Sequence, residues 1–147
     1  ASAGKMLEIV GHHEKLVGKS GEGFYRYHGR RRSPNPLIGD LMRANGLAMG
    51  RAVSDSEIEM RCLLRMVNEA ARCMEEGIIT RADYLDMAML YGTGFPAFRG
   101  GVLRAADDIG IDTVVHTLSE YEQRFGPRFG VSSLLLEMKA RGGRFYP

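Results

Sequence analysis

Residues 54–77 decide the fold, and they read Ser-Asp-Ser-Glu-Ile-Glu-Met-Arg-Cys-Leu-Leu-Arg-Met-Val-Asn-Glu-Ala-Ala-Arg-Cys-Met-Glu-Glu-Gly. Ser54 with Glu57 three residues later forms a capping box, the pattern that marks a helix start. Apolar residues then recur at spacings of three and four, which predicts an amphipathic helix over 55–76. Gly77 is suited to the left-handed conformation that closes a helix. At about six turns, this helix is expected to be the central element.

Shorter segments with the same apolar spacing follow, and glycines separate them. Helices are expected over 81–91 with a stop at Gly92, over 101–109, from a cap at Asp112 to Phe125, and after a cap at Ser132 or Ser133. Thr80 with Asp83 repeats the capping pattern of the long helix. The prediction from residue 54 onward is an all-α fold, an antiparallel helical bundle with short loops. The nine methionines are interpreted as irregular core filling and not as a binding surface.

The N-terminal part has a different texture and is predicted to be an irregular extension. Residues 3–10 are expected to form a short helix, and three glycines make 18–23 a loop. Residues 24–27, Phe-Tyr-Arg-Tyr, are β-prone and are expected to be extended. Prolines, glycines and an arginine run make 29–53 the predicted linker to a helical domain at 54–147. The run Arg30-Arg31-Arg32 has two interpretations, an anion or phosphate site and a solvated linker, and the linker is favoured.

Composition limits the possible function classes. The 20 basic and 18 acidic residues give a net charge of +2, which does not favour a nucleic-acid partner. No stretch approaches the roughly 20 apolar residues of a membrane span. Cys62 and Cys73 lie about three helical turns apart, too far for a disulfide, so reduced thiols and a cytoplasmic location are expected.

Motifs for catalysis, metal or nucleotide are weak. The glycines of 18–23 do not have GxGxxG spacing and lack a strand–loop–helix context. The histidines show no metal-ligand spacing, and these are His12, His13, His28 and His116. Asn68 and Glu69, polar residues near the apolar face of the long helix, are interpreted as a hydrogen-bonding pair between helices. The sequence therefore predicts no catalytic, cofactor-binding or metal-ligating residue in this segment.

The loop at 92–101 is the most distinctive stretch. Phe95 precedes a proline and is therefore expected to be extended, with Phe98 packed beneath it. Arg99 is then expected to reach outward to a partner or an anion. A purely structural corner between two helices is the alternative, and it is favoured.

Several segments together resemble the 3-hydroxyacyl-CoA dehydrogenase family. Residues 18–27, Gly-Lys-Ser-Gly-Glu-Gly-Phe-Tyr-Arg-Tyr, resemble the GKKxGxGFYxY stretch that ends that family's helical domain. Residues 67–77 resemble its main dimerising helix, and 139–146 resemble the end of its multifunctional β-oxidation members. Residues 91–101 carry the most specific likeness, to the GFPPFRGG loop, with Ala97 at the second proline.

The resemblance implies a division of the chain and a role for it. Multifunctional members carry two tandem helical copies, so 1–28 would be the tail of copy one and 54–147 would be copy two. The family's reaction oxidises 3-hydroxyacyl-CoA with NAD through a His–Glu pair and an Asn that lie elsewhere, and the position equivalent to that Asn is Met60. The implied contacts to other domains or substrate are Lys19, Phe95, Phe98 and Arg99.

Two functions remain open at this point. In the first, the chain is the packing part of a fatty-acid β-oxidation enzyme, and alone it does not oxidise substrate. Its partners are the NAD-binding domain and the first helical copy, and it is expected to form a homodimer through Met60, Leu64 and Val67 of the long helix. The alternative is a free-standing helical interaction module. A reading frame that extends upstream into a glycine-rich βαβ segment would favour the first.

Overall fold

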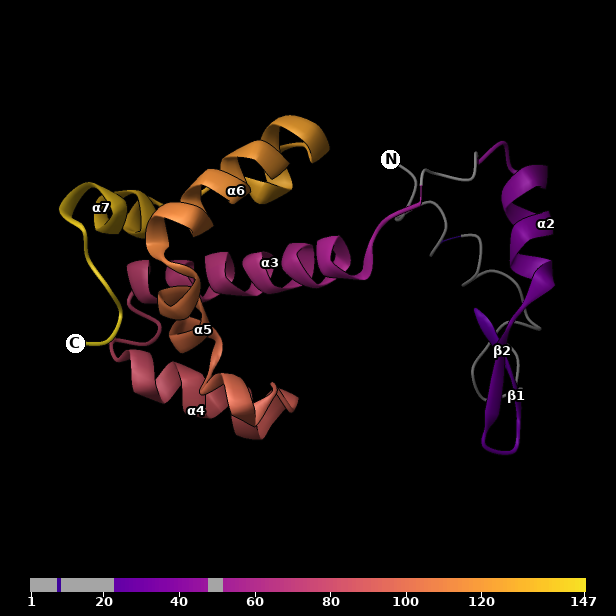
Figure 1. Ribbon diagram of the computed structural model, residues 1–147, viewed down its shortest axis with the longest axis horizontal. Coiled ribbons are helices and arrows are strands. Elements are labelled where there is room, and N and C mark those ends of the chain that lie inside the picture. Colours follow the sequence, from indigo (N-terminus) through magenta and orange to yellow (C-terminus); the bar gives the residue numbers. More distant parts are fainter. Residues whose placement is uncertain (1–7, 9–22, 48–51) are drawn as a thin grey trace. The chain divides into compact units, whose positions relative to one another are not determined.

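The computed structural model describes residue 8, residues 23–47 and residues 52–147 (Figure 1). The chain divides into two compact units, an N-terminal unit of Ala1–Ala52 and a helical unit of Val53–Pro147. The helical unit is all-α, as the apolar spacing predicts. The helix predicted over 3–10 lies outside the described residues apart from Glu8, which is helical, and so does the loop predicted at 18–23 apart from Gly23.

The described part of the N-terminal unit is a hairpin followed by a helix. Strands β1 (Tyr25–His28) and β2 (Arg31–Pro34) pair antiparallel, and α2 spans Pro36–Ala44. Asn35 joins them, because its side chain accepts a hydrogen bond from the first turn of α2 and donates one to the Gly23 carbonyl at the base of the hairpin. Regular structure therefore occupies much of the segment that the sequence predicts to be a linker.

The central helix α3 spans Asp55–Glu75, within one residue of the prediction. Ser54 caps it as predicted, since its hydroxyl accepts the Glu57 N–H at 3.2 Å. The Glu57 carboxylate forms ion pairs with Arg61 and with Arg124 of helix α6 (Ile111–Phe125).

Helix α4 begins and ends at other residues than the sequence predicts. Helix α4 spans Ala82–Thr93 and closes at Gly94, whose φ of +71° is left-handed, and not at Gly92. Asp83 forms an ion pair with Arg81, the residue that precedes α4, and Thr80 does not cap the helix. The remaining helical elements are η3 (Ala97–Arg99), α5 (Val102–Ile109), α6, η4 (Pro127–Phe129) and α7 (Ser133–Arg141).

Helix α6 begins after a glycine, Gly110, and helix α7 begins after a serine, Ser132. Helix α6 begins at Ile111 directly after Gly110, so Asp112 lies inside the first turn, where its charge favours the helix dipole, and does not cap it. Ser132 caps α7, because its hydroxyl accepts the Leu135 N–H at 3.4 Å.

The core of the helical unit forms where α5 packs against α3, α4 and α6, with α7 closing over α3 and α6 (Figure 1). Leu64 and Val67 of α3 are completely buried in this core. The expectation that they face a second subunit is therefore wrong, since packing within the same unit already covers them. Met60 is only partly buried, and it lies on a different face, at the edge of the groove described below.

Asn68 is also completely buried, and it ties α3 to the loop before α7. Its amide group donates to the Gly130 carbonyl at 2.8 Å and accepts the Ser132 N–H at 2.9 Å. The predicted hydrogen-bonding role of Asn68 is confirmed, although the partner is loop backbone and Glu69 is exposed. A buried amide satisfied on both sides is expensive to replace, because each backbone group would lose its partner.

Two buried carboxylates hold the start of α5 and the end of the chain. Asp86 accepts the backbone N–H groups of Leu103 and Arg104 at 2.8 and 3.0 Å, which satisfies the first turn of α5. Asp86 also accepts the Tyr146 hydroxyl at 2.7 Å. Asp107 accepts the N–H groups of Phe145 and Tyr146 at 3.0 and 2.9 Å. These bonds fasten the final residues to the core.

The contact between Tyr146 and Asp86 makes the free energy of unfolding sensitive to alkaline pH. Burial, and after it the hydrogen bond to the Asp86 carboxylate, raise the pKa of the Tyr146 phenol above its ordinary value of 10.0. A raised folded-state pKa means that the stabilisation is complete below pH 10 and is lost as the pH rises above it. We expect the free energy of unfolding to fall above about pH 10. Tyr146→Phe should remove that part of the fall in urea titrations; an identical fall in the variant would contradict this.

Candidate docking groove

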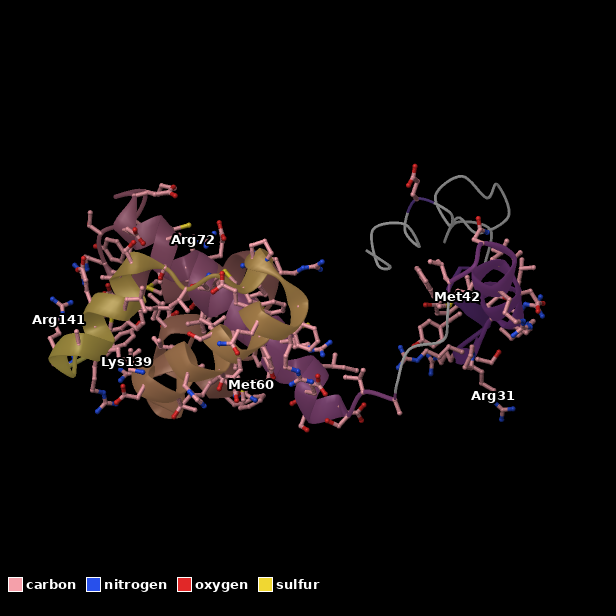
Figure 2. All side chains as sticks on the ribbon, turned by 90° about the horizontal axis from the view of Figure 1, so that it is seen from above. Arg31, Met42, Met60, Arg72, Lys139 and Arg141 are labelled. Atoms are coloured by element: carbon pink, nitrogen blue, oxygen red, sulfur yellow. The ribbon has the colours of Figure 1, made fainter. Side chains whose placement is uncertain are left out.

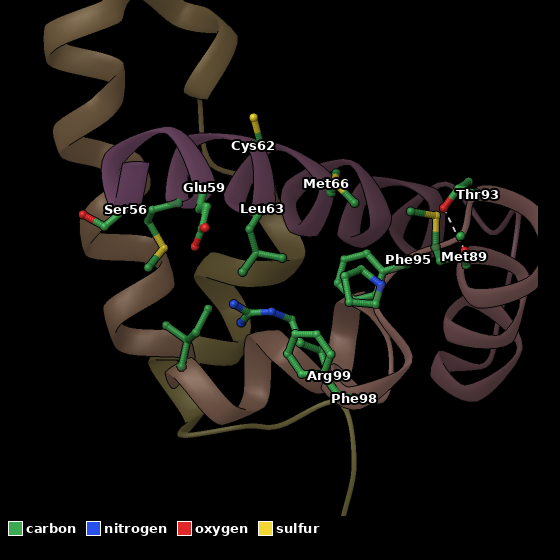
Figure 3. Close-up of a pocket in the computed structure, with 14 residues that line it drawn as sticks. Ser56, Glu59, Cys62, Leu63, Met66, Met89, Thr93, Phe95, Phe98 and Arg99 are labelled. Atoms are coloured by element: carbon green, nitrogen blue, oxygen red, sulfur yellow. Dashed lines mark hydrogen bonds between the residues drawn. The ribbon is translucent and has the colours of Figure 1, made fainter. Parts of the chain in front are cut away.

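An open, mostly apolar groove of about 840 Å³ runs along the helical unit (Figure 3). Its lining comes from the first half of α3, from the end of α4, from the loop that follows α4 and from the last residue of α5. The apolar side chains that define it include Met60, Leu63, Met66, Met89, Phe95 and Phe98. The charged side chains among its lining residues are Glu59 and Arg99, which project into the same opening (Figure 3).

The loop after α4 shapes the groove. Phe98 was predicted to pack inward and Arg99 to reach outward, and the structure shows the reverse. Phe95 is 7% exposed and belongs to the core, with its N–H bonded to the Met89 carbonyl. The turn η3 carries Phe98 outward, so this ring is 86% exposed and is not packed beneath Phe95. Arg99, expected to reach outward, is half-buried along the groove with its guanidinium 5.7 Å from the Phe98 ring centre.

Gly101, the last residue of this loop, shows why the motif ends in a glycine. Its φ is +128°, and a Cβ at this position would lie 2.1 Å from the Asp86 Cγ. Only glycine allows the backbone to approach Asp86 closely enough for the carboxylate to reach the first N–H groups of α5. Gly101 thus fixes where the loop ends and α5 begins.

Three methionines of the groove show where sequence reasoning missed the site. Met60 and Met66 lie on α3 and Met89 on α4; all three pack against the core, as expected, but they also line the open groove. Met138 does fill the core, at 2% exposed. A thioether on an unbranched chain adapts to many partner shapes, so clustered methionines at a surface favour protein contacts. The sequence does contain the signal that was missed. Met60, Leu63 and Met66 form a second apolar row on α3, beside the row of Leu64 and Val67 that enters the core.

The sequence also singled out Lys19, the histidines and the two cysteines. Lys19 lies outside the described residues. His28 lies in β1 and His116 is an exposed residue of α6, 3.7 Å from Glu120, while His12 and His13 are not described. Within residues 23–47 and 52–147, no group of three His, Cys, Asp or Glu side chains could hold a metal ion. Cys62 and Cys73 are both free thiols, as predicted.

The described residues also do not fit a dinucleotide. Such a site needs a parallel strand followed by a glycine-rich turn and a helix N-terminus. The strands described here form an antiparallel hairpin, and the glycines at the groove follow helices. No helix in the described part of the chain is both long and apolar enough to cross a bilayer.

Known proteins match the sequence of this chain. The family model for the 3-hydroxyacyl-CoA dehydrogenase C-terminal domain matches residues 58–146, which include the C-terminal contacts and every groove-lining residue except Ser56. The fatty acid oxidation complex subunit alpha of Vibrio cholerae is 40% identical over 130 residues, which cover 88% of this chain and 18% of that protein. The protein of the same name from Shewanella loihica is 38% identical over 129 residues, 87% of this chain and 18% of that protein.

This chain thus spans less than a fifth of the length of those relatives. The family model, in contrast, covers more than half of this chain and includes nearly all of the helical unit. The loop that carries Phe98 and the Asp86–Gly101 contact lie within that match. The chain belongs to the family of the 3-hydroxyacyl-CoA dehydrogenase C-terminal domain.

Proposed function

We propose that this chain is the C-terminal helical part of a fatty-acid β-oxidation enzyme that oxidises 3-hydroxyacyl-CoA to 3-ketoacyl-CoA with NAD. In this proposal the chain docks onto the rest of the enzyme and supplies no reacting group. The NAD-binding domain and a first helical copy are its partners, and the whole enzyme is cytoplasmic. The family match and the names of the relatives support this assignment.

The groove is the observation that carries the docking role. Phe98 exposes 86% of its surface beside an apolar channel, and covering such a side chain is worth about 1.5–3 kcal/mol. An amphipathic helix laid into the channel would cover Phe98 and the methionines together, while Glu59 and Arg99 would remain available to polar groups of the partner. The buried acids Asp86 and Asp107 are committed to backbone N–H groups, which supports a structural role for them.

A chain that lacks its partner is expected to cover the same surface with a second copy of itself. We therefore propose a homodimer through the groove, with Met60 at the contact. The predicted participation of Leu64 and Val67 is not part of this proposal, because both are buried in the core. Two identical grooves facing each other would form a two-fold interface.

Phe98→Asp tests the groove as a docking surface. A charge at the centre of an apolar contact should weaken association at least roughly thirtyfold, the effect of losing a strong interface residue. Sedimentation would compare self-association of this chain, and its binding to the Vibrio cholerae alpha subunit truncated before the matching segment. Leu136→Asp is the control, since Leu136 is 49% exposed on α7 outside the groove. Equal effects of both changes, or no association at high micromolar concentration, would contradict the proposal.

A further inference from the structure

The hairpin of the N-terminal unit presents an aromatic and basic face. Two residues, Gly29 and Arg30, connect the strands, and the φ of +60° at Gly29 suits a turn with glycine in its first position. The register places Tyr27 opposite Arg32 and Tyr25 opposite Pro34. Directly paired residues and those two positions along a strand share one face, so both tyrosines and Arg32 lie together.

The turn and the second strand of this hairpin carry a run of three exposed arginines. Residues 23–39 contain four arginines and no acidic residue. Arg30, Arg31 and Arg32 are exposed, and Figure 2 shows Arg31 projecting away from the ribbon. Within the part of the chain that the structure describes, no ion pair joins these three to a carboxylate. The ordered strands and this charge make the solvated-linker interpretation the weaker one.

The two tyrosines are not equivalent. The Arg32 guanidinium lies 5.3 Å from the centre of the Tyr25 ring, so Tyr25 helps to hold Arg32 in place. Tyr27 is 52% exposed, and among the described residues no arginine lies over its ring. A planar ring can therefore stack on Tyr27 while Arg30 and Arg32 reach anionic groups beside it. Asn35 fixes the base of the hairpin to α2, which keeps this arrangement ordered.

We propose that this face binds the phosphorylated adenosine end of a coenzyme A thioester. The inference rests on the proposed function, in which a CoA thioester is the substrate. Adenine supplies a flat ring for Tyr27, and the 3′-phosphate and diphosphate supply the charge for Arg30 and Arg32. Four-residue strands at about 3.3 Å per residue give a surface roughly 13 Å long, which suits one nucleotide better than a nucleic-acid strand.

Calorimetry on the 147-residue chain with adenosine 3′,5′-bisphosphate tests this. Arg30→Ala and Arg32→Ala should each weaken binding by about tenfold, as loss of a charge-assisted contact does. Tyr27→Leu should weaken it on the order of tenfold through lost stacking. The matched controls Arg141→Ala and Tyr91→Leu change exposed residues of the helical unit and should leave binding unchanged.

Four results would overturn the inference: no binding at millimolar concentration, no effect of the hairpin variants, equal binding of pyrophosphate, and tighter binding of an oligodeoxyadenylate or of anionic vesicles. The first of these together with normal association through the groove would remove only the nucleotide site. Nucleotide binding without any association through the groove would instead remove the docking role.

Discussion

Leu64→Asp is expected to unfold the helical unit. The side chain of Leu64 is completely buried where α3 meets the other helices. The change removes a core leucine and leaves a carboxylate without a partner, at a cost of at least about 5 kcal/mol. That cost is comparable with the whole stability of a domain, about 5–15 kcal/mol. Far-UV circular dichroism should show loss of helix and of a cooperative urea transition.

Ile58→Asp is the matched control for this change. Ile58 lies on the same helix but is 49% exposed and close to the helix N-terminus, where an acidic side chain is tolerated. We expect it to change the free energy of unfolding by less than about 1 kcal/mol. A folded, monomeric Leu64→Asp protein would show that Leu64 serves an interface and that the described packing of α3 is wrong.

Gly101→Ala is expected to have the second largest effect. The added methyl group would lie 2.1 Å from the Asp86 Cγ, and the backbone φ of +128° already disfavours any side chain. Either the carboxylate moves away from the first turn of α5 or the loop shifts, and we expect a loss of about 3–5 kcal/mol. Urea denaturation measures this loss directly.

Gly94→Ala separates the two causes. Gly94 has a left-handed φ of +71°, and a Cβ there would meet nothing within 4 Å. It should therefore cost only the backbone strain, about 1–2 kcal/mol. Equal losses at Gly94 and Gly101 would mean that the close approach to Asp86 does not matter.

The sequence predicted the helices well because their signals are local. Apolar spacing and the Ser54 cap placed α3 to within one residue, and Ser132 was one of two predicted caps for α7. Asp83 and Asp112 were misread, because the same residue types also serve as ion-pair partners and as first-turn residues. Sequence preferences alone cannot show whether Asp83 supports a cap at Thr80 or pairs with Arg81, because both residues lie within three positions of it.

The groove was harder to predict because it depends on tertiary contacts. The resemblance directed attention to Phe95, Phe98 and Arg99, but spacing could not tell which ring turns inward. Whether an apolar residue of α3 meets the core or solvent depends on where α5 packs, so Leu64 and Met60 were placed on one face. The β-prone residues 24–27 do lie largely in β1, but β2 was missed, because arginines and prolines are common in linkers and strand pairing is not visible in either strand alone.

Reconstitution of activity tests the docking role most directly. The Vibrio cholerae alpha subunit truncated before its matching 130 residues would be assayed for oxidation of 3-hydroxyacyl-CoA with NAD, alone and with this chain added. The account predicts no turnover by this chain alone, low turnover by the truncated subunit, and a gain when the two are mixed that Phe98→Asp abolishes. Turnover by this chain alone, or a mixture no more active than the truncated subunit, would contradict it.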